Sequence, residues 1–336
     1  MDILTPTPQQ QIGNGTKKQI SKDNDDARKL IVKDNGELKS YSEIYVSTRT
    51  AVVVTNCFID LEKLFENIPI AQYEPVQKRR GRKKRVNIER PIPKLPFGSV
   101  VSAQYEQKAR GTLLKPQNEH FLHCVVIYIV IDPNQAPFGE NNFPNVKIYT
   151  NGKLHITGCK SDDDYVNAFK AVLQLFDTIK QYTGEDVIAN KPSTYTALFN
   201  TVMQNIDFYI GFGICRESLD RYIKKYTNYN SIYEGSISPG VSVKIPVSTE
   251  KDERLVSLSY DPVTKQMERA IVNLEEHKSF FVRKNKNRDR YHTFRIYASG
   301  NIIFTSAGSD MEDVYNNFVS DLIKNKEHFE ETLSNE

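Results

Sequence analysis

The sequence has no apolar stretch long enough for a transmembrane helix, and its N-terminus lacks the apolar core of a signal peptide. Its four cysteines are isolated, with no CxxC pair, so zinc and disulfide-exchange motifs have no support. Single cysteines of this kind are typical of an intracellular, reducing compartment. The six histidines have no ligand spacing, and P-loop, Rossmann and Ser/His/Asp signatures are absent. We therefore expect no cofactor, no metal, no membrane partner, no small-molecule substrate and no catalytic activity.

The overall charge is nearly balanced, but it is unevenly distributed. The 336 residues carry a net charge of +3, which does not by itself indicate a nucleic-acid partner. Residues 77–96 form a low-complexity basic insert, in which Lys78–Arg90 holds eight Lys or Arg and one Glu. Its centre, Arg80-Gly81-Arg82, is similar to a hook that binds the DNA minor groove. The same run is equally typical of a nuclear-localisation patch, of non-specific phosphate attraction or of a solvated loop.

The chain is expected to divide into a tail and two folded parts. Residues 1–44 are polar and predict a flexible tail. Residues 45–185, with the basic insert, form one part, and residues 186–330 form the other. The patterns predict strands over 44–60, 98–107, 120–131, 195–213, 241–247, 255–260, 270–274 and 279–284. They predict helices over 61–68, 161–182, 217–226 and 311–328.

One segment occurs twice. Lys147–Lys160 reads KIYTNGKLHITGCK, and Arg295–Gly308 reads RIYASGNIIFTSAG. Each copy begins with a basic residue, Ile and Tyr, passes through a glycine and closes on a strand that contains Thr. Each is followed at once by an acidic helix start. A unit that returns once, near the other end of the chain, indicates two related halves.

Each copy predicts a β-hairpin with a three-residue loop and glycine in the left-handed position. A two-residue turn at Asn151-Gly152 would mix polar and apolar side chains on both faces, whereas the longer loop separates them. The apolar face would carry Val146, Ile148, Leu154, Ile156, Phe294, Ile296, Ile302 and Phe304. The opposite face would carry Lys147, Tyr149, Lys153, His155, Thr157, Arg295, Tyr297, Asn301, Ile303 and Thr305. We expect helices to cover the apolar face.

These segments resemble the "IFxSGKxxxTGAK" segment of the TATA-box-binding protein family, which occurs once in each half of those proteins. Gln204-Asn205 resembles the "QN" that opens the family's second repeat. The likeness is clearest over residues 145–182 and 293–325, and it is similar to the versions carried by large DNA viruses. It implies an α+β fold with two pseudo-symmetric β-α-β(n)-α repeats. These would form a saddle-shaped, curved antiparallel sheet with helices on the convex face.

The resemblance also implies which side chains would wedge between base steps in the minor groove. Tyr149 and Tyr297 stand where the family has an intercalating Phe. A partner wedge lies upstream in each family repeat. Gap-free counting places it at Phe280 in the second half, with Phe281 one residue away, and the preceding strand suggests Phe121 or His123 in the first.

Further DNA contacts are expected on the same face. Thr157, Thr305 and Asn205 match groove-contacting residues of the family, Ile303 is a further groove contact, and Lys147, Lys153 and Arg295 are candidate phosphate contacts. Asn205 has no matching Asn in the first half, where Thr48 or Thr50 stands instead. His155 and Asp207 depart from the family, which has apolar residues there. A carboxylate that faces DNA is costly unless it is paired.

The sequence therefore predicts a general transcription initiation factor that binds and bends duplex DNA through the minor groove. Its partners would be A·T-rich promoter DNA, a protein like transcription factor IIB, and RNA polymerase. It would act in the nucleus or in a viral factory. A single-strand-binding or structural protein, with tyrosines as stacking platforms, is an alternative. The DNA-binding domain of a repair enzyme is another.

Overall fold

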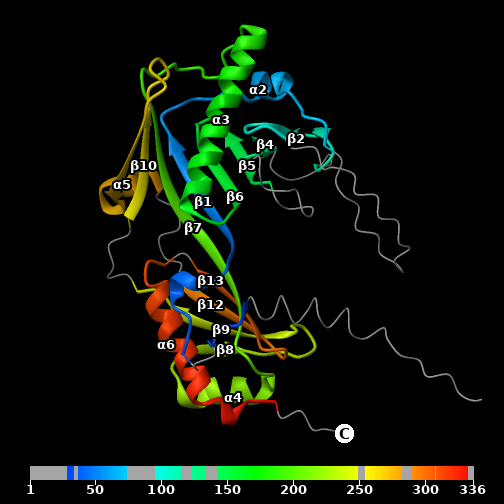
Figure 1. Cartoon of the computed structure of the whole chain (residues 1–336), viewed down its shortest axis with the longest axis vertical. Helices are drawn as coiled ribbons and strands as arrows, with labels where there is room; N and C mark the ends of the chain where they lie inside the picture. Colours follow the sequence, from blue (N-terminus) through cyan, green and yellow to red (C-terminus); the bar gives the residue numbers. More distant parts are fainter. Residues whose placement is uncertain are drawn as a thin grey trace, which may run out of the picture.

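A computed structural model describes residues 29–33, 37–73, 95–114, 123–132, 143–248, 254–281, 290–306 and 308–331. These residues form one sheet of thirteen strands, with helices packed on one of its faces. Figure 1 shows two groups of elements along the long axis, joined by the long strands β1 (Val46–Thr55) and β7 (Tyr195–Tyr209). In the part of the chain so described, no helix is both long and apolar enough to cross a membrane.

The two halves of the sheet have the same strand order over five strands each, and the first half has one further edge strand, β3. The first runs β3-β2-β4-β5-β6-β1, and the second runs β8-β9-β12-β13-β7. The remaining first-half strands are β2 (Val100–Tyr105), β3 (Lys108–Gly111), β4 (Cys124–Ile129), β5 (Asn145–Tyr149) and β6 (Leu154–Cys159). Those of the second half are β8 (Asn230–Ile232), β9 (Gly240–Pro246), β12 (Tyr291–Tyr297) and β13 (Asn301–Ser306). The predicted α+β saddle of two pseudo-symmetric halves is confirmed.

The halves meet where β1 and β7 pair antiparallel, with Arg49 opposite Gln204. In each half the first strand in sequence lies at the middle of the sheet, and its neighbour is the last strand of that half. The pseudo-twofold axis therefore passes close to Arg49 and Gln204. Each half is completed by its own helices and its own apolar core.

Helices cover the same face of the sheet in both halves. The first core packs under α2 (Leu61–Asn67) and α3 (Asp162–Thr183), and the second under α4 (Arg216–Tyr226) and α6 (Met311–Lys324). Two of these helices begin with a side-chain cap. The backbone N–H of Lys63 donates to Asp60 at 3.0 Å, and that of Asp164 donates to Ser161 at 3.2 Å. Each cap satisfies an N–H that the helix itself leaves without a partner.

Both hairpins have the predicted three-residue loop. Gly152 donates its N–H to the carbonyl of Tyr149, and Gly300 donates to the carbonyl of Tyr297, each at 2.9 Å. Both glycines have positive φ, +73° and +80°, where a side chain would be strained. The eight apolar residues assigned to one face are all buried, with at most 3% of their surface exposed. The register and the burial of both hairpins are therefore confirmed.

A second-half insertion overturns one predicted strand. Between β9 and β12 the chain forms the hairpin β10 (Arg254–Tyr260) and β11 (Met267–Asn273), followed by helix α5 (Leu274–Phe281). The strand expected over 279–284 is therefore wrong for residues 279–281, because they continue this helix. Strand β10 pairs with the N-terminal part of β7, so the hairpin extends the sheet alongside the first half.

Part of the expected tail is folded against the second half. The N–H of Ile31 donates to Tyr209 at 3.1 Å, and only 1% of the Ile31 surface is exposed. Further along, Tyr41 opens the short 3-10 helix Tyr41–Glu43 and packs its ring against Tyr315. The polar composition of 1–44 concealed these few apolar anchors, so the flexible-tail prediction is wrong for 29–33 and 37–44. Residues 1–28 lie outside the described ranges.

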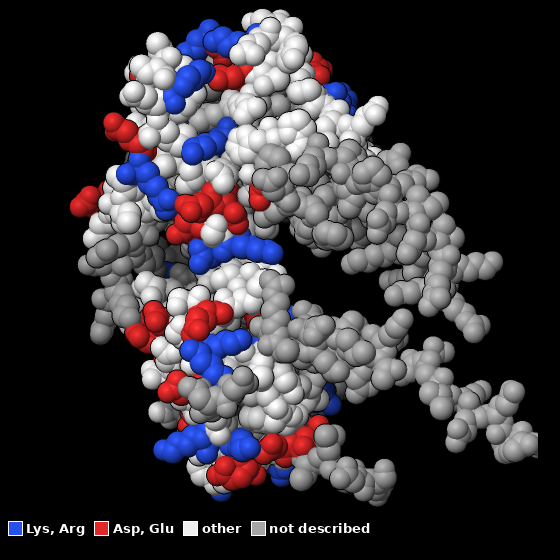
Figure 2. Space-filling view, viewed as in Figure 1, with Lys and Arg blue, Asp and Glu red and all other residues white. Residues whose placement is uncertain are grey.

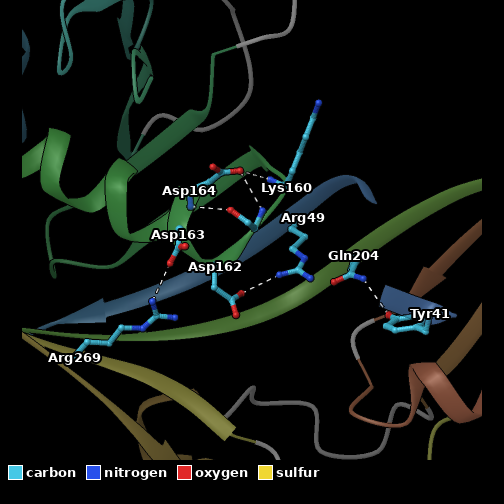
Figure 3. A network of polar contacts seen from close by, with 9 residues as sticks. Tyr41, Arg49, Lys160, Asp162, Asp163, Asp164, Gln204 and Arg269 are labelled. Atoms are coloured by element: carbon cyan, nitrogen blue, oxygen red, sulfur yellow. Dashed lines mark hydrogen bonds and ion pairs between the residues drawn. The ribbon is translucent and has the colours of Figure 1, made fainter. Parts of the chain in front are cut away.

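Ion pairs connect the middle of the sheet to the helices and to the inserted hairpin. Figure 3 shows Arg49 of β1 bonded to Asp162 at the start of α3, and Arg269 of β11 bonded to Asp163, each at 2.9 Å. Lys265 pairs with Asp177 of α3 at 2.6 Å and holds the other end of the hairpin. Figure 2 shows acidic and basic side chains next to each other at mid-height in the view, between the two groups of elements. Around these ion pairs the described residues therefore expose both signs of charge together.

Candidate nucleic-acid interface

The sheet face turned away from the helices carries most of the residues predicted to contact DNA, and we call it the concave face. Cross-strand partners share a face, so the strand registers define its members. They include Thr48, Thr50, Val52, Val54, Asn145, Lys147, Tyr149, Lys153, His155, Thr157, Leu198, Asn200, Met203, Asn205, Asp207, Tyr209, Ser242, Lys244, Thr293, Arg295, Tyr297, Asn301, Ile303 and Thr305. Most of these side chains are half-buried, whereas their neighbours along each strand are buried in the cores.

The two tyrosines occupy equivalent places, at the ends of β5 and β12. Tyr149 lies opposite Cys124 of β4, and Tyr297 lies opposite Gly240 of β9. A Cβ atom added to Gly240 would be 3.4 Å from the Tyr297 ring, so this ring packs over the glycine. Burial raises the pKa of Tyr149, so its hydroxyl stays protonated at neutral pH. Each half thus presents one half-buried phenol, supported from beneath by a small residue on the neighbouring strand.

Hydroxyl and amide groups lie between the tyrosines, near the middle of the concave face. The Thr305 hydroxyl donates to the Asn205 side chain at 2.8 Å, and the two residues are opposite each other. In the first half Thr157 is opposite Thr50 in the same way. Thr50, rather than Thr48, therefore occupies the place that Asn205 has in the second half. At this place the second half has the amide of Asn205, and the first half has the hydroxyl of Thr50.

Basic side chains flank each tyrosine. Lys147 lies opposite His155 on β6, and Lys153 follows the first hairpin loop. In the second half Arg295 lies opposite Ile303, and it is exposed. This placement brings positive charge to both halves of the concave face, where it would meet phosphates along a bound duplex.

Sequence reasoning missed Lys244, on strand β9. This lysine is on the concave face, opposite Thr293, with its ammonium 5.9 Å from the Tyr291 ring centre. The alternation of buried Val241, Val243 and Ile245 along residues 241–247 was the available signal, since it places Lys244 on the opposite face. The pairing of β9 with β12, which the inserted hairpin hides in the sequence, was not predicted.

Other predicted contacts do not join this cluster. Phe280 lies in helix α5, since the gap-free count back from the second hairpin ends in this helix and stops short of β9. The strand beside β12 is β9, whose residue opposite Tyr297 is Gly240. Phe121, Arg80 and Arg82 lie outside the described residues. The alternative to Phe121, His123, is exposed and directly precedes β4.

Two polar residues of the concave face distinguish the halves. Asp207 lies opposite Ile303, and at the equivalent place in the first half Val52 lies opposite His155. Burial lowers the pKa of His155, and the charge of Lys147 lowers it further, so its imidazole is neutral at neutral pH. The Ser47 hydroxyl donates to the Asp207 carboxylate at 3.2 Å.

The fold and this face together define an α+β saddle with helices on one side and an aromatic, hydroxyl and basic surface on the other. No family model matches the chain. The chain is 26% identical over 126 residues to a TATA-box-binding protein-like protein of Acanthamoeba polyphaga mimivirus. That match covers 36% of this chain and 33% of the relative, so the chain spans about a third of the relative's length. The resemblance predicted from the two hairpins is thereby confirmed.

A solved structure is also similar to this one. Methanococcus jannaschii TBP superimposes with a TM-score of 0.42 and 14% sequence identity. The superposition covers 84% of this chain and 98% of the archaeal chain.

Proposed function

We propose that this protein is a TATA-box-binding-protein-like transcription initiation factor that binds duplex DNA through the minor groove and bends it. The observation that carries the proposal is the matched pair Tyr149 and Tyr297, set at equivalent ends of one face and flanked there by basic residues. An aromatic ring held half-buried on a rigid strand can enter a base step, while the basic residues contact phosphates. In this proposal the protein acts by binding the duplex and bending it, and it catalyses no reaction.

The proposed promoter partners follow from this activity. A bent duplex on the concave face leaves the helix-covered face turned outward, where a protein like transcription factor IIB and RNA polymerase can assemble. The mixed charge of that face suits a protein partner better than a second nucleic acid. The DNA would be a promoter in the nucleus or in a viral factory.

The test measures duplex binding and bending separately. The full chain should bind an A·T-rich duplex, with an affinity that falls steeply as salt rises, and should bend it in an end-to-end energy-transfer assay. Replacing Tyr149 and Tyr297 by Ala should abolish most of the bending while it weakens binding less. Tyr182→Ala is the matched control, since Tyr182 is 85% exposed on helix α3, away from the concave face.

Two outcomes would contradict the proposal. If the double variant bends DNA as the wild type does, the tyrosines are not wedges. If single-stranded oligonucleotides compete with duplex at equal concentration, the tyrosines serve as stacking platforms for single strands.

A further inference from the structure

One carboxylate interrupts the otherwise neutral and basic concave face. Asp207 lies in β7 between Ile206 and Phe208, both 1% exposed in the second core, so its own side chain points to the opposite face. Of the thirteen strands that the structure describes, only β7 and β11 contain an acidic residue, and Glu268 of β11 lies in the inserted hairpin. Asp207 is thus a single acid near the middle of the surface proposed to face DNA.

The contacts of Asp207 leave most of its acceptor capacity unused. The Ser47 hydroxyl is 3.2 Å from one carboxylate oxygen and also 3.2 Å from the Asn205 carbonyl oxygen, so one hydrogen is shared between two acceptors. Within the described ranges, no Lys or Arg forms an ion pair with Asp207. A carboxylate has two oxygens with about four acceptor positions. The Asp207 carboxylate can therefore accept a further hydrogen bond from a donor on a ligand that covers it.

The floor of the minor groove offers such a donor at only one kind of base pair. A·T and T·A pairs present the acceptors adenine N3 and thymine O2, which repel a carboxylate. A G·C pair adds the exocyclic amino group of guanine, which is a donor. Covering Asp207 with an A·T pair would remove water from the carboxylate without returning a hydrogen bond.

We infer that Asp207 reads the amino group of a guanine, so that the bound DNA element contains a G·C pair under the second half of the sheet. This inference rests on the function proposed above. The guanine amino group donates one hydrogen bond to the carboxylate, and this bond is charge-assisted. The residue determines sequence specificity rather than overall attraction to DNA.

The equivalent place in the first half lacks this preference. There Val52 replaces the carboxylate, and the residue opposite is His155 in place of Ile303. A neutral imidazole carries one N–H donor and one acceptor nitrogen, and every base pair presents acceptors in the minor groove, so His155 does not require a guanine. The two halves therefore differ at symmetry-related places, and the element is directional, with the required G·C pair under the second half only.

The experiment compares the bases that the wild type and Asp207→Val select from a random duplex library, followed by affinity measurements on the selected element. We expect the wild type to select one G·C pair on one side and Asp207→Val to lose that preference. Replacing that guanine by inosine, which lacks the amino group, should weaken wild-type binding about tenfold and leave Asp207→Val unchanged. Replacing adenine by 2,6-diaminopurine at the same place in an all-A·T element should restore wild-type binding.

Glu268→Val is the matched control, since it also replaces an acid by valine in a strand, but in the inserted hairpin. It should keep the wild-type preference. If inosine and guanine elements bind the wild type equally while both proteins still bind and bend duplex, the inference fails and the proposed function stands. If the wild type binds no duplex, the proposed function fails and the inference fails with it. An unchanged thermal melt for Asp207→Val excludes misfolding as the cause of a lost preference.

Discussion

The glycine in each hairpin loop is the residue whose replacement by alanine should disturb the concave face most. Gly300 has a φ of +80°, and a Cβ atom there would lie 2.0 Å from the carbonyl oxygen of Phe212. Ordinary contact begins at 3.4 Å, so the loop or the Phe212 carbonyl would have to move by more than an ångström. Since Gly300 donates to the carbonyl of Tyr297, that movement would displace the tyrosine as well.

The expected cost of Gly300→Ala has two parts. A non-glycine residue in the left-handed region costs about 1–2 kcal/mol. Forcing a methyl group into an occupied space costs about 1–3 kcal/mol more. The free energy of unfolding should therefore fall by about 2–5 kcal/mol, a large share of the roughly 5–15 kcal/mol of a typical domain.

The matched control separates these two parts. Gly184 ends helix α3 with a φ of +74°, and a Cβ atom there would meet nothing within 4 Å. Gly184→Ala should cost only the backbone part, about 1–2 kcal/mol. Both variants would be measured by urea unfolding at equilibrium. Equal losses for Gly300→Ala and Gly184→Ala would refute the close packing of the second loop against Phe212, and with it the fixed position of Tyr297.

Two further predictions concern charge. Arg295→Ala should reduce the salt dependence of DNA affinity by about one unit of log–log slope, across all duplex sequences; an unchanged slope would place Arg295 away from phosphates. Burial acts to raise the pKa of Asp310, but the N–H of Ser248 and the side chain of His292 outweigh it and hold that pKa below 3.8. The depressed pKa stabilises the folded state above the unfolded-state pKa, so unfolding free energy should fall as pH drops below about 4. Asp310→Asn should lose this component, and parallel acid-unfolding curves for the two proteins would contradict it.

The hairpins show how far the sequence alone could lead. Period-two alternation, applied to two copies at once, separated Ile148 and Leu154 from Tyr149 and Lys153 without ambiguity. Since a slip by one residue would have exposed an apolar row, only one register was physically acceptable. Local patterns of this kind depend on burial alone, which is why they were predictable.

Long-range pairing was not predictable in the same way. Phe280 was the predicted partner of Tyr297 because gap-free counting along the chain cannot detect an insertion between two paired strands. The inserted hairpin pairs with β7 instead. The choice between Thr48 and Thr50 required the bulge in β6, where Arg49 pairs with Cys159 and Thr50 with Thr157, so that Gly158 has no partner on β1. A bulge adds a residue without leaving a mark in the composition. Both failures concern which strands meet, not which residues form strands.

The two faces of the sheet are under different physical constraints, and this difference explains how the halves diverged. On the helix-covered face, Ile148 and Ile296 are identical, and both are fully buried. A polar residue there would lose its hydrogen bonds to water and destabilise the half that holds it. On the concave face, Val52 of the first half corresponds to Asp207 of the second, and neither side chain belongs to an apolar core. One repeated scaffold can therefore keep its shape while one half acquires a base preference that the other lacks, and this is the physical basis for expecting a directional element.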